Sequence, residues 1–596
     1  MREVSVPPLI SIPDDYNLTA PVWRNAETDP DLVQFARRDG DGWRNVTAAQ
    51  FRDEVAALAR GLIAAGIGTG DRVALMSKTR YEWTLFDYAI WTVGGIVVPI
   101  YETSSAEQVE WILHDSGAVA CVVETQAHAE IVKSVAHKLP KLKLTWTIDD
   151  GAVDTLVAEG EACDPAAVDE RRHSRGASDI ATLIYTSGTT GRPKGCMLTH
   201  RNLASCVGNA IPVLRAMFHD EASTLLFLPL AHAFARMIQI GCVEAQATLA
   251  HASDLSTLLD DLASFRPTFL LSVPRVFEKV YNGARQKAYA SGKGAIFDRA
   301  EQVAIRYSEA LDSGGPGVWL RTQHALFDRL VYRKLRAALG GRCRHAISGG
   351  APLGTRLAHF FRGIGITVYE GYGLTETSPA TNVNLDNAFR IGTVGRPLPG
   401  VTQRIAPDGE ILIKGDLVFS GYWHNKRATA EAIDADGWFH TGDIGALDPD
   451  GFLTITGRKK ELIVTAGGKN VAPAILEDRV RAHPLVSQCV VVGDRKPFIA
   501  ALVTLDEEGL RQWLTQQGRS ADLSLEQARH DPDVQKEIQA AIDEANRAVS
   551  KAEAIRKFRI LPIDFTVQSG HLTPSMKVKR AEVVKDYADE IAALYD

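Results

Sequence analysis

Apolar positions along the first 124 residues follow two different spacings. Residues 53–65, DEVAALARGLIAA, repeat apolar side chains every three to four positions, which is typical of a helix with one buried face. Shorter apolar runs and helical stretches then alternate, and we expect strands at 72–78, 95–100 and 118–124 and helices at 83–91 and 106–117. Gly117 is expected to end the last of these helices. Strands that alternate with helices predict right-handed βαβ units and parallel sheets.

This alternation changes twice further along the chain. It resumes after residue 180 and continues to about residue 447, except that residues 275–345 predict long helices around the turn SGGPG at 313–317. After GRKKE at 457–461 the predicted elements become shorter and mix strands with charged helices. We therefore predict an α/β fold whose large N-terminal domain, residues 1–457, combines parallel-sheet α/β subdomains with a β-rich part. A small, mobile α+β C-terminal domain is predicted for residues 458–596, with a hinge near 458–460.

Composition and charge narrow the classes of function. The 596 residues are too many for one hydrophobic core, and 45% hydrophobic with 23% charged residues are ordinary values for a soluble enzyme. The net charge of −7 argues against a surface built for nucleic acid. The longest apolar run, residues 88–100, is too short for a membrane-spanning helix, and the proline-broken N-terminus does not resemble a signal peptide. We expect a cytoplasmic protein.

The spacing of cysteine and histidine argues against a zinc site. The seven cysteines are an odd number, no two lie within four positions of each other, and no HExxH sequence occurs. This distribution fits reduced thiols in a cytosol.

A loop rich in glycine and hydroxyl groups follows a predicted strand at residues 185–195, YTSGTTGRPKG. It does not match the Walker A loop, because Pro193 stands where the second glycine is required and Gly195 follows Lys194. Backbone N–H groups, hydroxyls and one lysine can still converge on a phosphate. The same residue types are common in surface hairpin turns, so the loop alone leaves both interpretations open.

Six further motifs follow in order along the chain. They are SGGAPL (348–353), YEGYGLTET (369–377), GTVGRPLPG (392–400), WFHTGDIG (438–445), GRKKELIVTAGGKNVAP (457–473) and LTPSMKVKR (572–580). Together with the glycine loop they resemble the adenylate-forming superfamily, which contains acyl-CoA synthetases, peptide-synthetase adenylation domains and firefly luciferase. Seven motifs in the same order over nearly the whole chain are far more specific than any single one.

The resemblance implies an ATP-dependent ligase that works in two steps. A carboxylate attacks the α-phosphate of ATP and pyrophosphate leaves, and a thiol then displaces AMP from the acyl-adenylate. The resemblance assigns the β- and γ-phosphates to Thr186, Ser187, Gly188, Thr189, Thr190, Gly191 and Lys194. It assigns the rest of the nucleotide to Gly349, Gly350, Ala351, Tyr372, Gly373, Thr375, Asp443, Arg458 and Lys577.

Individual roles also follow from the resemblance. Tyr372 is expected to stack on adenine, Thr375 to bond the α-phosphate, and Asp443 to accept hydrogen bonds from the ribose hydroxyls. Mg²⁺ is the expected cofactor, with Glu376 as its ligand and Thr186 as a second oxygen. The expected catalytic residues are Lys577, His232, Thr186 and Glu376. Without the other motifs, Asp443 would read as a helix cap and Tyr372 as a core aromatic residue.

Two further assignments concern the hinge and the thiol. Lys460 aligns with the hinge position of the family, although a solvated lysine in the basic run RKK is an equally weighted alternative. The loop residues Gly467, Gly468 and Lys469 align with the path of CoA. ATP and CoA are thus the expected co-substrates.

The acid is expected to be a long-chain fatty acid. FLPLAHAFAR at 227–236, SVPRVFEKVY at 272–281 and the helical stretch at 276–345 resemble long-chain fatty acyl-CoA synthetases. Arg236 departs from that pattern, since some members carry an aromatic gate to the acyl tunnel at this position.

Two alternatives to the CoA ligase stay open. One is a fatty acyl-AMP ligase that loads a carrier protein, although the extra insertion typical of that group before the hinge is not recognised here. The other is a non-catalytic, membrane-docked fatty-acid-binding protein. The intact Thr186, Lys194, Glu376, Asp443 and Lys577 argue against the second alternative.

A basic stretch at residues 321–344 has two interpretations. It holds seven Arg or Lys against one Asp, and Leu326, Leu330, Val331 and Leu335 have roughly helical spacing. Such a stripe is able to rest on anionic lipid as a peripheral contact at the inner face of a membrane. A helix packed on its domain with a solvated basic face explains the same pattern, and we favour it from the sequence. The sequence predicts no oligomeric state.

Overall fold

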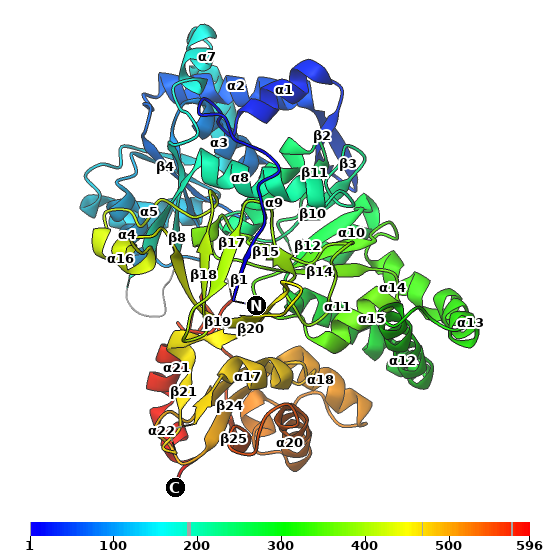
Figure 1. Ribbon diagram of the computed structural model, residues 1–596. Helices are drawn as coiled ribbons and strands as arrows, with labels where there is room; N and C mark the ends of the chain where they lie inside the picture. Colours follow the sequence, from blue (N-terminus) through cyan, green and yellow to red (C-terminus); the bar gives the residue numbers. More distant parts are fainter. Residues whose placement is uncertain (1, 187–191, 255, 468, 574–575) are drawn as a thin grey trace.

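The computed structural model describes residues 2–596 except 187–191, 255, 468 and 574–575 (Figure 1). Three sheets and their helices form a large N-terminal body, and a smaller body follows it along the chain and lies below it in Figure 1. The α/β fold with a β-rich part and a small α+β domain, predicted from the sequence, is confirmed.

A six-stranded sheet forms the first layer, in the order β7-β6-β4-β5-β8-β9. Its strands are β4 (Arg72–Met76), β5 (Ile96–Ile100), β6 (Ala120–Val123), β7 (Leu144–Thr147), β8 (Ile180–Thr186) and β9 (Lys194–Thr199). All neighbours pair in parallel except β8 and β9. This arrangement confirms the predicted βαβ units.

The helices of this layer begin and end where local signals place them. They are α1 (Ala20–Thr28), α2 (Ala48–Ala64), α3 (Tyr81–Thr92), α4 (Ala106–Ser116), α5 (Gln126–Val135), α6 (Ala152–Glu159) and α7 (Ala166–Arg172). Thr47 caps α2 through a reciprocal bond pair with Gln50, and Ser105 does the same for α4 with Gln108. Gly117 ends α4 in the left-handed conformation, as predicted.

A nine-stranded sheet forms the second layer, in the order β16-β15-β14-β13-β12-β10-β11-β2-β3. Its strands are β2 (Val33–Asp39), β3 (Gly42–Thr47), β10 (Ser223–Leu226), β11 (Thr248–His251), β12 (Phe269–Ser272), β13 (His345–Ser348), β14 (Thr367–Tyr372), β15 (Asn382–Val383) and β16 (Arg396–Pro397). Helices α8 (His200–Ala210) and α9 (Ala233–Glu244) contribute apolar residues to one core cluster that contains strands of both sheets. The nucleotide motifs therefore lie on strands that share a rigid core.

The β-rich part is a five-stranded antiparallel sheet in the order β1-β17-β18-β19-β20. Its strands are β1 (Glu3–Ser5), β17 (Thr402–Ile405), β18 (Glu410–Lys414), β19 (Phe439–Leu447) and β20 (Leu453–Arg458). Helix α16 (Lys426–Ala432) lies between β18 and β19 in the chain. The register of β19 and β20 sets Asp443 opposite Arg458.

The region that predicted long helices is a helical subdomain with its own apolar cluster. It contains α10 (Leu258–Phe265), α11 (Pro274–Ala290), α12 (Gly294–Leu311), α13 (Val318–Phe327), α14 (Arg333–Ala338) and α15 (Thr355–Gly363). The helical stretch predicted after the turn at 313–317 is interrupted by a π-helical turn at Asp328–Tyr332. Helices α12 and α13 extend to the edge of the molecule (Figure 1).

The small body has a mixed sheet, β23-β24-β25, with apolar clusters that contain residues from Ile463 to Leu594. Its elements are β21 (Ile463–Val464), β22 (Asn470–Val471), α17 (Pro473–Arg481), β23 (Val486–Val492), β24 (Ile499–Leu505), α18 (Glu507–Gln516), α19 (Leu525–Ala528), α20 (Pro532–Asn546), β25 (Ile555–Ile560), α21 (Arg580–Asp586) and α22 (Ala588–Ala592). The division at 457/458 and the mobility of this body stay predictions. Arg275 Nη2 on α11 donates to Asp506 Oδ2 at 2.8 Å and links the two bodies.

The apolar run at residues 88–100 is the end of α3 followed by the buried strand β5, as predicted. Among the described residues, no helix combines the length and the apolar character needed to cross a bilayer.

Candidate active site

Asp443 is held by two partners from different parts of the large body. Arg458 Nε lies 3.0 Å from its Oδ1, and Tyr372 Oη donates to its Oδ2 at 2.6 Å. The side chain of Asp443 is almost fully buried, whereas that of Arg458 is nearly half exposed. Burial, and then the charge of Asp443, raises the pKa of Tyr372 well above its usual value, so this phenol is a donor at neutral pH.

The adenine-side motifs meet because they follow adjacent parallel strands. Gly349, Gly350 and Ala351 come directly after β13, and Tyr372 ends its neighbour β14. Carboxyl ends of neighbouring parallel strands lie at the same edge, which is where α/β sheets bind ligands. Gly373 continues from Tyr372 and has no room for a side chain, since an added Cβ would lie 1.8 Å from the carbonyl oxygen of Pro379.

The two ends of the glycine loop are paired with each other. Thr186 ends β8, Lys194 begins β9, and the two residues are opposite partners in the antiparallel register. Ser187, Gly188, Thr189, Thr190 and Gly191, which the sequence assigns to phosphate, lie outside the described residues.

A tryptophan of α4 contacts the second arm of this loop. Trp111 Nε1 donates to the carbonyl oxygen of Pro193 at 2.8 Å, and the guanidinium of Arg192 lies 4.8 Å from the Trp111 ring centroid. Sequence analysis missed Trp111, since it reads as an apolar position of an ordinary amphipathic helix. The contact holds the arm that leads into Lys194.

Tyr422 connects Lys194 to Glu376. The Lys194 ammonium lies 4.9 Å from the Tyr422 ring centroid, and Tyr422 Oη donates to Glu376 Oε1 at 2.8 Å. Thr186 Oγ1 lies 3.8 Å from Cys196 Sγ, and burial together with the nearby Glu376 charge raises the pKa of Cys196 well above its usual value. Thr186, Lys194 and Glu376 are therefore grouped in the structure, and their roles toward phosphate and metal stay predictions.

Tyr422 and Cys196 were also missed by sequence analysis. The β-bridge between these two residues joins segments that are far apart in the chain. The only local signal is that Tyr422 follows Gly421 in the aromatic sequence GYWHN.

The acidic groups at this site fit a magnesium ion that is shared with phosphate. Within the described part of the chain, no three His, Cys, Asp or Glu residues are grouped closely enough to hold a metal by themselves. Mg²⁺ is commonly bound by one or two carboxylates together with waters and substrate phosphates. Glu376, with the Thr186 hydroxyl nearby, is suited to that mode and not to an all-protein cage.

Lys577 reaches the large body from the small one. It lies in a turn closed by the bond from the Thr573 amide to its carbonyl oxygen at 2.8 Å and by the bond from its own amide to Thr573 Oγ1 at 3.0 Å. The side chain is accessible to solvent, yet the surrounding protein desolvates it and lowers its pKa. The charge of Arg458 lowers the pKa further, whereas Asp443 and Glu376 oppose the shift.

His232 lies within the electrostatic reach of Lys577. It is the N-cap of α9, and its Nδ1 accepts from the Phe234 amide at 3.2 Å. Burial, and then the charge of Lys577, lowers the pKa of His232 to about 4, so the ring is neutral at neutral pH. Because Nδ1 is an acceptor, the proton of the neutral ring is on Nε2.

The described residues predicted for the hinge and for the CoA path are exposed in a turn and a loop. Lys460 is exposed in the turn Lys459–Glu461 that follows β20. Gly467 and Lys469 are exposed in the loop between β21 and β22, and Lys469 Nζ lies 3.6 Å from Glu553 of the small body. Gly468 lies outside the described residues.

Arg236 is buried in the core. Its guanidinium bonds Asp87 Oδ1 at 2.5 Å and Thr182 Oγ1 at 2.7 Å, and it lies over the rings of Trp83 and Trp91. Gln239 Nε2 donates to the second Asp87 oxygen at 2.8 Å. These contacts make Arg236 part of a buried polar network.

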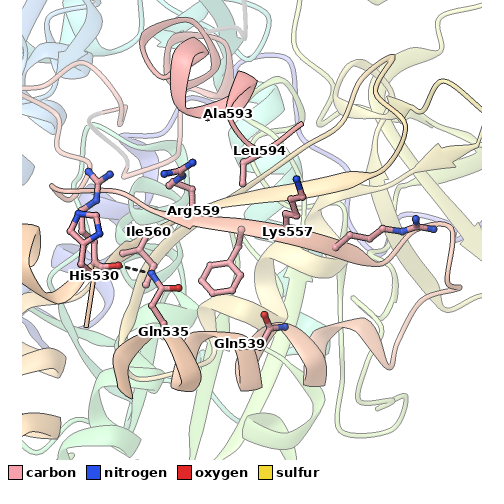
Figure 2. Close-up of a pocket in the computed structure, with 11 residues that line it drawn as sticks. His530, Gln535, Gln539, Lys557, Arg559, Ile560, Ala593 and Leu594 are labelled. Atoms are coloured by element: carbon pink, nitrogen blue, oxygen red, sulfur yellow. Dashed lines mark hydrogen bonds between the residues drawn. The ribbon is translucent and has the colours of Figure 1, made fainter. Parts of the chain in front are cut away.

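A separate pocket of about 410 Å³ lies in the small body, between α20, β25 and the end of α22. Figure 2 shows Gln535 and Gln539 from α20 on one side and Lys557, Arg559 and Leu594 on the other. Among the described residues, none of those predicted for nucleotide, metal or acid lines this pocket. The motif residues around Asp443, Glu376 and Lys577 therefore form the candidate active site.

The chain belongs to the AMP-binding enzyme family, which it matches over residues 22–423, and residues 460–596 match the AMP-binding enzyme C-terminal domain. It is 53% identical to the long-chain-fatty-acid–CoA ligases FadD15 of Mycobacterium bovis and Mycobacterium tuberculosis, over the full length of this chain and of theirs. The long-chain-fatty-acid–CoA ligase ACSBG2 of Xenopus laevis is 33% identical over 95% of this chain and 82% of its own length.

Solved structures share the fold. The A domain of carboxylic acid reductase from Segniliparus rugosus, in complex with AMP and a co-purified carboxylic acid, aligns with a TM-score of 0.73 and 22% identity over 97% of this chain and 94% of its own. Mycobacterium tuberculosis fatty acyl CoA synthetase aligns with a TM-score of 0.62 and 22% identity over 96% and 99% of the two chains.

Proposed function

We propose that this protein is an ATP-dependent long-chain fatty acid–CoA ligase. The observation that carries the proposal is the grouping of the motif residues. Tyr422 joins Lys194 to Glu376, and Tyr372 and Arg458 hold Asp443. The charge of Lys577 in the small body acts on the same residues and on His232. The full-length similarity to long-chain-fatty-acid–CoA ligases supports the acid and the acceptor. The seven cysteines are free, which supports a reducing, cytoplasmic location.

Adenylate formation needs charge stabilisation more than covalent chemistry. The fatty carboxylate attacks the α-phosphate, and negative charge moves to the departing pyrophosphate. Lys577 stabilises the carboxylate and the α-phosphate, while Lys194 and the Thr186 hydroxyl hold the β- and γ-phosphates. Neutral His232 stands beside the acyl carbonyl, where its Nε2 proton is available as a donor. Asp443 accepts from the ribose hydroxyls and Tyr372 lies against adenine.

Mg²⁺ belongs to this proposal as the cofactor. Glu376 would hold it, with Thr186 as a hydroxyl ligand, and the ion would neutralise charge on the phosphates. The hydrogen bond from Tyr422 fixes one carboxylate oxygen of Glu376 and so orients the group.

The second step requires that the CoA thiol reach the acyl carbonyl. The CoA thiol attacks the acyl carbonyl and AMP leaves, so space must open where Lys577 now lies. Rotation of the small body about Lys460 would remove Lys577 and bring Gly467, Gly468 and Lys469 to the pantetheine path. The exposed position of Lys460, two residues after the end of β20, supports this hinge.

The decisive experiment incubates purified protein with ATP, Mg²⁺ and fatty acids of increasing length, with and without CoA. Pyrophosphate, AMP and acyl-CoA are measured separately. Each methylene buried in an apolar site contributes roughly 0.8 kcal/mol, so kcat/KM should rise with chain length and then level off. A preference for acetate or an aromatic acid over palmitate would exclude the fatty-acid assignment.

The same assay separates the alternatives. Pyrophosphate release without acyl-CoA would favour a ligase that loads a carrier protein. Binding of fatty acid without pyrophosphate release would favour a non-catalytic binding protein.

A further inference from the structure

Lys577 lies in a short hairpin whose base is formed by His571 and Lys579. The carbonyl oxygen of His571 accepts from the Lys579 amide at 2.8 Å, and Leu572 forms an antiparallel bridge with Val578. The backbone of His571 is therefore tied directly to the segment that presents the Lys577 side chain.

The imidazole ring of His571 is buried and has a polar partner at each nitrogen. Only 6% of the residue is exposed. Its Nδ1 lies 3.0 Å from Ser569 Oγ, and its Nε2 lies 3.0 Å from Asp586 Oδ2. Because an ionised carboxylate only accepts hydrogen bonds, Nε2 carries a proton and donates it to Asp586. The two contacts fix the rotation of the ring.

Aromatic neighbours fix the plane of the same ring. The ring centroids of Phe565 and Tyr587 lie 5.2 Å and 5.5 Å from that of His571. Asp586 is the last residue of α21 and Tyr587 follows it, whereas Ser569 precedes the hairpin in the chain. His571 thus holds the hairpin to the segments on both of its sides.

The position of the Lys577 ammonium depends on this anchored backbone. The charges of Asp443 and Glu376 act on it, but within the described part of the chain no hydrogen bond or ion pair fixes its Nζ atom. A displacement of about 1 Å at a reacting group can cost about 10²-fold in rate. Small movements of the hairpin should therefore impair the reaction.

We propose that His571 is a positioning residue for adenylate formation, because its contacts with Ser569 and Asp586 orient Lys577 toward the carboxylate and the α-phosphate. The inference rests on the function proposed above and goes beyond it, since His571 stands directly before the motif LTPSMKVKR and outside it. Its effect is confined to the first step, because the second step requires that Lys577 leave the site.

The test is a double-mutant cycle on the rate of pyrophosphate release. His571→Phe keeps a ring against Phe565 and Tyr587 and removes both polar contacts. It should lower kcat for adenylate formation about tenfold or more and leave the KM for ATP within about twofold. In the Lys577→Ala background the same substitution should change the rate by less than about twofold, because the group that it positions is gone.

Two variants divide the contacts of the ring. His571→Gln places an amide donor near the position of Nε2 and keeps the contact with Asp586, so it should restore part of the rate that His571→Phe loses. Asp586→Ala leaves the buried ring in place and removes one hydrogen bond, so it should lower kcat about threefold to tenfold. It enters the same cycle with Lys577→Ala, so the test does not depend on the folding of one variant.

The matched control is His530→Phe, the same substitution at a histidine of the small body whose side chain is 69% exposed. It should leave both half-reactions unchanged. In His571→Phe, thioester formation from supplied acyl-adenylate should also stay near wild type, which shows that the protein is folded. Amide hydrogen exchange should become faster in residues 571–580 and stay unchanged in the rest of the small body.

The outcomes separate this inference from the proposed function. Normal pyrophosphate release by His571→Phe and Asp586→Ala would overturn the inference and leave the proposed function intact. A loss that persists in the Lys577→Ala background, or equal losses in both half-reactions, would make His571 a general structural residue and would also overturn it. Normal pyrophosphate release by Lys577→Ala would overturn both the inference and the role of Lys577 in the proposed function.

Discussion

At the scale of single residues, the buried ion pair between Asp87 and Arg236 should contribute to the stability of the large body. Both side chains are almost inaccessible to solvent and bond at 2.5 Å. Removing one member of a buried pair leaves an uncompensated charge, which typically costs about 3–5 kcal/mol. We expect Arg236→Met to lower the free energy of unfolding of the large domain by that amount, measured by urea denaturation at pH 7.

The double variant Arg236→Met/Asp87→Leu provides the contrast. It removes both charges from the core, so it should be more stable than Arg236→Met alone. Equal loss in the single and double variants would contradict the ion-pair explanation. Arg427→Met, at an exposed position, should change stability by less than about 0.5 kcal/mol.

The buried side chain of His200 should make the free energy of unfolding depend on pH. Its Nδ1 accepts from the Leu18 amide at 3.2 Å, and burial lowers its pKa to about 3 from its usual value of about 6.5. Between these values the unfolded chain binds a proton that the folded protein does not, so stability falls as the pH falls through 6.5. Relative to His200→Gln, the wild type should lose about 2 kcal/mol between pH 7 and pH 5.

The comparison of the two proteins isolates this residue from other buried histidines. If the free energies of unfolding of wild type and His200→Gln changed equally over this pH range, the pKa of His200 would not be lowered in the folded protein.

The proposed metal ligand Glu376 should contribute strongly to the rate of adenylate formation. Its carboxylate accepts from the Tyr422 hydroxyl at 2.8 Å, and its charge helps to raise the pKa of the buried Cys196 thiol. Removing one electrostatic partner of a transition state typically costs at least ~10²-fold in rate. Glu376→Gln should therefore slow pyrophosphate release by at least that factor, whereas Glu431→Gln on exposed α16 should not. Near-wild-type adenylation at low Mg²⁺ concentration would contradict the assignment.

At the scale of secondary-structure elements, helix α4 supports the hairpin that carries the glycine loop. Trp111 donates to the Pro193 carbonyl and lies against Arg192, while Tyr185 Oη donates to Asp115 Oδ2 at 2.6 Å. Trp111→Phe keeps an aromatic ring but removes the indole donor. We expect the KM for ATP to rise about threefold to tenfold, because a neutral hydrogen bond contributes about 0.5–1.5 kcal/mol.

Stability and fatty-acid preference provide the internal control for Trp111→Phe. Both should stay close to wild type, because phenylalanine keeps an aromatic ring against the core cluster and only the bond to the loop is lost. An unchanged KM for ATP would show that α4 does not position the loop during adenylation.

At the scale of the whole molecule, the two half-reactions should depend on different parts of the small domain. Lys577→Ala should slow adenylate formation by at least ~10²-fold and leave thioester formation from supplied acyl-adenylate largely intact. Lys460→Pro should do the reverse, because proline restricts the backbone rotation that a hinge requires. Single-turnover assays of each half-reaction provide the measurement.

Lys579→Ala is the matched control, because Lys579 lies in the same basic tail, two residues after Lys577. It should leave both half-reactions near wild type. If Lys577→Ala impaired both steps equally, or neither, alternation of the small domain would be ruled out.

Local chemistry determined much of this fold before any tertiary contact was known. Helix α4 begins at the Ser105 cap and ends at Gly117 because both signals act within one turn of the chain. The apolar strands β4 to β6 were predictable for the same reason, since fully buried parallel strands are short, continuous apolar runs. The nucleotide motifs were readable because their chemistry requires particular residue types at short spacing.

Partners that are distant in sequence were decided by the tertiary structure alone. Tyr422 bonds Glu376, and the charge of Lys577 acts on His232 and Asp443, because separate sheets and the small body bring these segments together. The same reason places Arg236 in the core with Asp87, at a position where some members of the resembled family carry an aromatic gate. The apolar positions of α13 have ordinary helical spacing in the sequence, and their exposure follows from the absence of described elements that cover that side. Periodicity and caps are properties of neighbouring residues, whereas burial and pairing depend on which distant segments the fold brings into contact.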